Sequence, residues 1–87
     1  MAETSTNPVI IYSTTWCGYC KMLKKYLTDK GINWLEKDIE NDGAAHSELM
    51  EKIGGNFRGV PVSDVDGTII LGFDRPAIDA ALAKQMA

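Results

Sequence analysis

Two cysteines, Cys17 and Cys20, stand three positions apart, and they are the only cysteines in the chain. A pair at this spacing can exchange disulfides, close a structural disulfide or provide half of a metal site. A structural disulfide around so short a loop would restrict the unfolded chain little. Tetrahedral zinc needs about four ligands, and His46 is the only histidine, so a metal would have to be shared between chains. Redox chemistry is therefore the favoured interpretation.

The two thiols differ in where they fall along the chain. Cys17 falls at the start of a predicted helix, where unpaired backbone N–H groups and the positive end of the helix dipole favour a thiolate. Lys21 adds positive potential, and Gly18 has no side chain to obstruct the approach to Cys17. Cys20 falls nearly one turn further in, closer to the core. We therefore expect an exposed, attacking Cys17 and a resolving Cys20.

The apolar periodicity of the chain predicts the elements that position this pair. Four segments are typical of strands, and three have the spacing of amphipathic helices. In chain order, the expected elements are a strand at 9–12, a helix at 18–30, a strand at 32–39, a helix at 43–53, strands at 61–65 and 68–71, and a helix after residue 74. Asp66-Gly67 is a hairpin signal, because both turn residues need positive φ. Asn41 or Asp42 is expected to cap the second helix and Asp74 the last.

The order βαβαββα predicts an α/β domain. Strands that alternate with helices favour a parallel pair with crossover connections, and the closing hairpin adds antiparallel strands. We expect a mixed four-stranded sheet flanked by three helices that cover both faces. This domain would span residues 8–87, and residues 1–7 would form a flexible polar tail.

Composition and charge exclude several classes of function. The chain has 87 residues and a net charge of −3, without the basic surplus that nucleic-acid binding requires. No apolar run approaches the length of a membrane span, and the opening residues MAETSTNP lack the apolar core of a signal peptide. A lone cysteine pair at this spacing fits a reducing compartment. We expect a soluble, cytoplasmic monomer that binds neither nucleic acid nor membrane.

Pro61 opens the third predicted strand, where a missing N–H is tolerable. From the residue alone it could be an ordinary trans edge proline or a cis proline in a specified turn. Together with the Cys-x-x-Cys turn and the βαβαββα order, the chain resembles the glutaredoxin branch of the thioredoxin superfamily over about residues 8–85. The resemblance implies a thioredoxin fold, a cis proline beside Cys17 and thiol–disulfide oxidoreductase activity.

The resemblance also implies which residues contact a small thiol. In that family glutathione lies extended along the cis-proline loop, and such backbone pairing is a known mode of peptide recognition. The substrate-contacting residues implied in this way are Tyr19, Arg58, Val60, Pro61, Gly72, Phe73 and Asp74. For Arg58, a solvated position on the surface is as good an interpretation as a contact with the small thiol. Trp16, beside the first cysteine, is expected to line the substrate surface or to cap the sheet edge.

Two subgroups of this family compete for the resemblance. Many glutathione-using members carry Lys where this chain has Thr14, and Thr-Val-Pro where it has Gly59-Val60-Pro61. Mycoredoxins, which serve the sugar-based thiol mycothiol, commonly show Trp-Cys-Gly-Tyr-Cys with that Thr. The stretches that also look like theirs are Asp38-Ile39-Glu40, Ala44-Ala45 and Gly54-Gly55-Asn56. Gly72-Phe73-Asp74-Arg75-Pro76 is instead similar to redoxins that reduce ribonucleotide reductase. The mycoredoxin subgroup is slightly favoured.

These subgroups imply different partners. We expect no tightly bound cofactor, and a low-molecular-weight thiol, mycothiol or glutathione, as co-substrate. The protein partners would be disulfide-containing or S-thiolated proteins, and in the redoxin alternative also a flavoprotein, thioredoxin reductase. A further alternative is a binding protein in which two chains share an iron–sulfur cluster or zinc.

The remaining polar residues favour structural interpretations. Glu36, Asp38, Glu40 and Asp42 alternate along the chain without the spacing of a calcium loop, which indicates a solvated acidic edge. His46 is expected on an exposed helix face, as a surface residue rather than a catalytic base.

Overall fold

The computed structural model describes residues 8–15, 17–57 and 59–86, with the side chains described up to residue 84. Its elements, in chain order, are β1 (Val9–Ser13), α1 (Gly18–Asp29), β2 (Trp34–Asp38), α2 (Gly43–Ile53), β3 (Val62–Val65), β4 (Thr68–Leu71) and α3 (Arg75–Met86). The predicted order βαβαββα is confirmed, and most boundaries shift by only one or two residues. Of the described helices, none is long and apolar enough to cross a bilayer.

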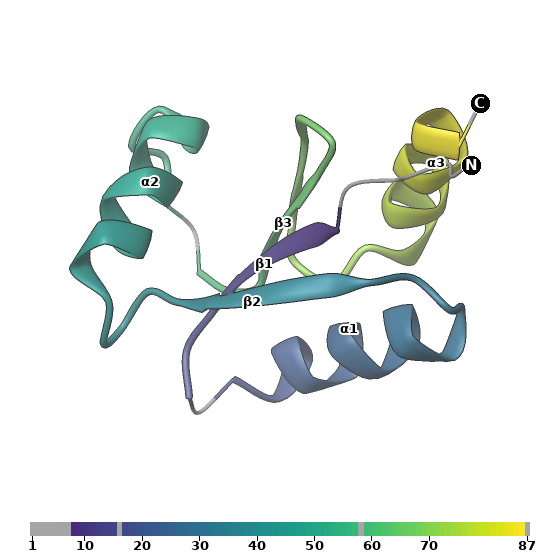
Figure 1. Ribbon diagram of the computed structural model, residues 1–87. Coiled ribbons are helices and arrows are strands. Elements are labelled where there is room, and N and C mark those ends of the chain that lie inside the picture. The colour runs from purple at the N-terminus through teal and green to yellow at the C-terminus, as the bar shows by residue number, and fades with distance from the viewer. Residues whose placement is uncertain (1–7, 16, 58, 87) are drawn as a thin grey trace.

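The strands form one mixed sheet in the order β2-β1-β3-β4. β1 and β2 run parallel, with Val9 opposite Trp34 and Ser13 opposite Asp38, and the connection between them runs through α1 (Figure 1). β3 is antiparallel to both β1 and β4. The predicted α/β class, with a four-stranded mixed sheet and three helices, is confirmed.

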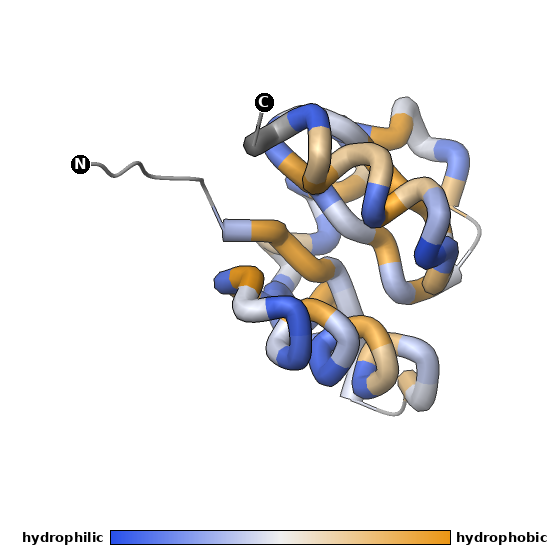
Figure 2. Tube along the Cα trace, turned by 90° about the vertical axis from the view of Figure 1, so that its right-hand side faces the viewer, coloured by the Kyte–Doolittle hydropathy of each residue, from blue (hydrophilic) through white to orange (hydrophobic). Residues whose placement is uncertain are grey.

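Helices cover both faces of the sheet because β1 presents apolar side chains to each face. Val9 and Ile11 point to the side covered by α1 and α3, whereas Tyr12 points to the side covered by α2. The first core cluster contains Val9, Ile11, Leu23, Leu27, Val65, Ile70, Ile78, Ala81 and Leu82. The second contains Tyr12, Ile39, Ala45, Leu49 and Val62. Figure 2 shows the matching alternation of hydrophobic and hydrophilic residues along the helices.

Local side-chain hydrogen bonds set the ends of the elements. The Asp42 carboxylate accepts the N–H groups of Ala44 (3.0 Å) and Ala45 (3.3 Å), so Asp42, one of the two predicted candidates, caps α2. Asp66 and Gly67 have φ of 51° and 94°, which confirms the predicted hairpin turn.

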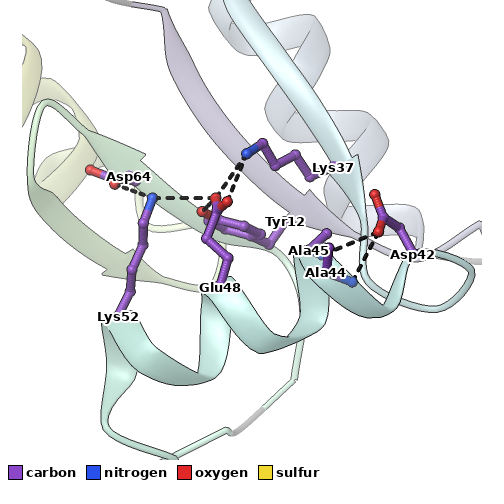
Figure 3. A network of polar contacts seen from close by, with 8 residues as sticks. All are labelled: Tyr12, Lys37, Asp42, Ala44, Ala45, Glu48, Lys52 and Asp64. Atoms are coloured by element: carbon purple, nitrogen blue, oxygen red, sulfur yellow. Dashed lines mark hydrogen bonds and ion pairs between the residues drawn. The ribbon is translucent and has the colours of Figure 1, made fainter.

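A polar network fastens α2 to the sheet (Figure 3). The Tyr12 hydroxyl donates to the Glu48 carboxylate, and Lys37 Nζ donates to both oxygens of Glu48 at 2.9 Å. Lys52, one turn further along α2, lies 3.7 Å from Glu48 and 2.6 Å from Asp64 of β3. The hydrogen bonds from Tyr12 and then Lys37 lower the pKa of Glu48 to about 2. The network thus ties α2 to β1, β2 and β3.

Candidate active site

Cys17 and Cys20 are joined by a disulfide, with their Cα atoms 5.3 Å apart. Cys17 is the N-cap of α1, and the backbone N–H of Cys20 donates to Cys17 Sγ at 3.0 Å. The N-terminus of α1 therefore offers a donor to the first sulfur, as the sequence predicts. Cys20 is 1% exposed and Cys17 only 5%. The expectation that Cys17 is exposed is wrong for the disulfide form, in which Cys17 is joined to the buried Cys20.

Cys17 is nevertheless reached through a groove of about 460 Å³, which we call the Cys17 groove. Its walls come from three parts of the chain: Tyr19 beside the pair, His46 on α2, and Phe57 and Val60 before β3. Tyr19 is 63% exposed and Phe57 43%, so two aromatic rings stand open to solvent beside the reactive sulfur. A mostly apolar groove with aromatic walls and a few polar groups suits a small organic ligand.

The proline loop lies against this groove. The Val60–Pro61 peptide bond is cis, as the family resemblance implies, and Val60 lines the groove with Cys17. Pro61 itself is buried, and its carbonyl accepts the N–H of Gly72 at 2.8 Å. Gly72 therefore joins the proline loop from the end of β4, although it does not line the groove.

The two residues after Gly72 lie elsewhere. Phe73 packs against the first core cluster, with its ring 5.9 Å from that of Tyr26 in an edge-on arrangement. The Asp74 carboxylate accepts the N–H of Ala77 at 3.2 Å, as expected for the residue before α3. Neither lines the Cys17 groove. Their contact with a substrate stays a prediction. Two further predicted site residues, Trp16 and Arg58, lie outside the described residues.

The supporting residues flank the pair on opposite sides. Gly18 lines the Cys17 groove, and a Cβ built there would meet nothing within 4 Å. This open space is consistent with an unobstructed approach to Cys17. Lys21 lines a second, smaller cavity behind the disulfide.

That second cavity, which we call the rear cavity, has a volume of about 190 Å³. Both cysteines line it, together with Ser13 of β1 and Glu36 and Asp38 of β2. The parallel register places the carboxyl ends of β1 and β2 side by side, directly behind the start of α1. The sequence analysis missed this cavity, although the carboxyl ends of parallel strands are where such sites form.

His46 and Glu40 also line the Cys17 groove, which the sequence did not predict. His46 is exposed, as expected, but the face of α2 that carries it looks onto the groove. Glu40 accepts the Thr15 hydroxyl at 3.0 Å. Asp38 accepts the N–H of Glu40 at 2.8 Å and the side-chain amide of Asn41 at 2.8 Å, so this acidic stretch builds a turn. Within the described part of the chain, no group of three metal-binding side chains converges.

The fold and the site together match one family. The family model described as glutaredoxin matches residues 9–70, which include the cysteine pair, the cis proline, β1 to β3 and all of β4 except Leu71. The chain belongs to the glutaredoxin family. A putative glutaredoxin of Mycobacterium tuberculosis is 39% identical over 80 residues, covering 91% of this chain and 94% of that protein. This glutaredoxin is thus a redox protein built around the Cys17–Cys20 pair.

Two solved structures place this glutaredoxin among its structural relatives. A buckwheat glutaredoxin in complex with glutathione superposes with a TM-score of 0.69 at 27% identity, over 91% of this chain and 76% of that one. The glutaredoxin-like NrdH-redoxin of Escherichia coli superposes with a TM-score of 0.73 at 20% identity, over 85% and 93%. The second likeness shows the shared fold.

Proposed function

We propose that this protein reduces disulfides through Cys17, using a low-molecular-weight thiol as the source of electrons. The observation that carries the proposal is the position of Cys17 Sγ. It sits at the N-cap of α1 with a backbone N–H 3.0 Å away, and it opens onto a groove able to hold a small thiol. A donor so placed stabilises a thiolate, which is the reactive form of cysteine.

The reduction of a mixed disulfide takes two thiol–disulfide exchanges. In the reduced protein, the Cys17 thiolate attacks the small-thiol sulfur of a mixed disulfide, and the protein thiolate leaves and takes a proton. A second small-thiol anion then attacks the adduct sulfur, forms the small-molecule disulfide and returns Cys17 as thiolate.

Protein disulfides follow a route that uses both cysteines. The Cys17 thiolate attacks one sulfur of the target disulfide and forms a mixed disulfide with it. Cys20 loses its proton and attacks Cys17 Sγ, which closes the disulfide seen in the structure and releases the reduced target. Small thiols then reduce the pair again.

The groove favours a thiol that carries less negative charge than glutathione, and we propose mycothiol. Thr14 lines the groove where many glutathione-using members carry Lys. Among the described lining residues there is no lysine or arginine, and the ionisable groups besides Cys17 and Tyr19 are Glu40 and His46. Among these described groups a carboxylate-rich ligand finds little fixed positive charge, whereas sugar hydroxyls can pair with the polar ones. The resemblance of the sequence to mycoredoxins supports the same choice.

The test compares three electron donors on one S-thiolated protein: mycothiol, glutathione, and thioredoxin reductase with NADPH. We expect turnover with mycothiol at least tenfold above that with glutathione. Turnover with the flavoprotein alone would make the protein a redoxin of the ribonucleotide-reductase type and overturn the mycothiol proposal. Failure with all three donors would overturn the reductase proposal itself.

Two variants separate the roles of the cysteines in the same assay. Cys17→Ser is expected to be inactive, because it lacks the attacking sulfur. Cys20→Ser is expected to keep activity on mixed disulfides and to lose it on protein disulfides. Activity retained in Cys17→Ser would contradict the assignment of the attacking thiol.

A further inference from the structure

The rear cavity brings a set of charged groups next to the disulfide. Cys20 lines the rear cavity but not the groove. With a volume of about 190 Å³, the cavity admits several water molecules. The sulfur of Cys20, otherwise buried, therefore meets its polar surroundings through this cavity.

An anchored ion pair stands in the cavity. The buried Ser13 hydroxyl donates to Glu36 Oε2 at 2.6 Å, and Lys24 Nζ lies 3.0 Å from the same oxygen. Ser13 is 1% exposed, so the hydrogen bond holds Glu36 from inside the fold. The side chains of Lys24 and Glu36 are 25% and 33% exposed, less than most surface pairs. The hydrogen bond from Ser13, followed by that from Lys24, lowers the pKa of Glu36, which therefore stays ionised near neutral pH.

Reduction of the disulfide creates charge next to this pair. A thiolate attacks Cys17 Sγ, the bond between Cys17 and Cys20 breaks, and its electron pair goes to Cys20 Sγ. A second thiolate then attacks the sulfur bound to Cys17, forms the disulfide of the reductant and releases Cys17 as a thiolate, which completes the reduced pair. The new Cys20 thiolate must take a proton through the rear cavity. Fixed charges nearby change the free energy of the thiolates, and hence the balance between the disulfide and the reduced pair.

We propose that the Lys24–Glu36 pair, anchored by Ser13, sets the charge of the rear cavity and thereby tunes how easily the Cys17–Cys20 disulfide is reduced. Lys24 favours the reduced pair because its ammonium group attracts thiolate charge. Glu36 opposes this and holds Lys24 in place. These are positioning residues, which act on the sulfurs through the charge they hold. The inference rests on the proposed redox use of the pair.

Other charged groups also lie around the cysteines. Lys21 and Asp38 also line the rear cavity, one from α1 and one from β2. The Asp38 carboxylate is engaged by the turn at Asn41. Glu40, in the turn before α2, and His46, in the first turn of α2, line the groove with Cys17. Lys21, Asp38, Glu40 and His46 are all retained when Lys24 or Glu36 is substituted, so wild type and variants share them.

The test is the equilibrium between the purified protein and a dithiothreitol buffer at pH 7, read as the ratio of reduced to disulfide protein. A unit charge that lines the same partly wet cavity shifts such an equilibrium by about threefold, which is about 14 mV for two electrons. Lys24→Met is expected to lower the reduced fraction by that factor. Glu36→Gln is expected to raise it, and the double variant to return close to wild type.

The exposed pair on the same helix provides the matched control. Lys25 and Asp29 lie 3.1 Å apart, with side chains 78% and 60% exposed, and neither lines the rear cavity. Lys25→Met and Asp29→Asn remove the same charges from the same helix, and solvent screens them. They should leave the equilibrium within experimental error of wild type.

The sign of the change in the ratio of reduced to disulfide protein distinguishes a charge effect from a loss of packing. Loss of packing would move Lys24→Met and Glu36→Gln in the same direction, whereas a charge effect moves them in opposite directions. Shifts of the same sign, or shifts no larger than those of the control pair, would overturn the inference. A wild-type protein with no reversible disulfide in this buffer would instead overturn the proposed function, so the two failures are distinguishable.

Discussion

At the scale of single residues, the chemistry depends on a difference between two cysteines. Cys17 caps α1, accepts a backbone hydrogen bond and opens onto the groove, whereas Cys20 faces only the rear cavity. In the proposed function, this difference gives one sulfur access to substrates and keeps the other for intramolecular attack. Thr14 lies between the two environments, because it lines both the groove and the rear cavity.

Thr14→Lys tests whether charge at this position selects the small thiol. A lysine here adds positive charge to a groove whose described lining has none that is fixed. Glutathione carries a net negative charge, so KM for a glutathione mixed disulfide should fall about three- to tenfold. KM for the uncharged hydroxyethyl disulfide should change less than twofold, which controls for effects on Cys17 itself. An equal change for both substrates would contradict a charge-based selection.

At the scale of elements, the start of α2 holds part of the groove in place. Asp42 caps this helix through the N–H groups of Ala44 and Ala45, and His46 follows within one turn. The polar network around Glu48 then fastens the middle of α2 to the sheet (Figure 3). A shift of α2 would therefore move the groove wall that carries His46.

Asp42→Ala should lower the free energy of unfolding by about 1 kcal/mol, because two N–H groups at the start of α2 lose their acceptor. Urea denaturation of the variant and of wild type measures this difference. Asn41→Ala is the matched control, since Asn41 contributes only an exposed hydrogen bond to Asp38. Equal losses in the two variants would show that Asp42 is not the cap.

At the scale of the whole molecule, local sequence signals predicted the fold, but they could not predict part of the candidate site. Apolar periodicity and the Asp66-Gly67 turn depend on residues that are close together in the sequence. The order of helices and strands could therefore be predicted from the sequence. The rear cavity depends on the strand register that sets Ser13 opposite Asp38. This pairing joins residues that are far apart in the sequence, so it could not be predicted from either of them. His46 likewise lies at the groove because of how α2 sits on the sheet. The prediction that Cys17 is exposed was wrong for the disulfide form, because burial depends on the tertiary surroundings of the turn and not on its sequence.

Global stability should depend on acid pH through Glu48. Its pKa in the folded protein is about 2, against an ordinary 4.5, so between these values the unfolded chain binds more protons. The stabilisation is complete above about pH 4.5 and is lost as the pH falls towards 2. Urea midpoints at pH 3 and pH 6 should differ more in wild type than in Glu48→Gln. An identical pH dependence in the two proteins would contradict this role for the network.

The most direct test of the central claim is the site of the covalent adduct. Cys20→Ser, reduced and then treated with a mixed disulfide of the small thiol, is digested and its peptides are weighed by mass spectrometry without reduction. The account predicts the small thiol on the peptide that contains Cys17, formed at the rate of turnover. A thiol adduct on Cys20 in Cys17→Ser, formed equally fast, would contradict it.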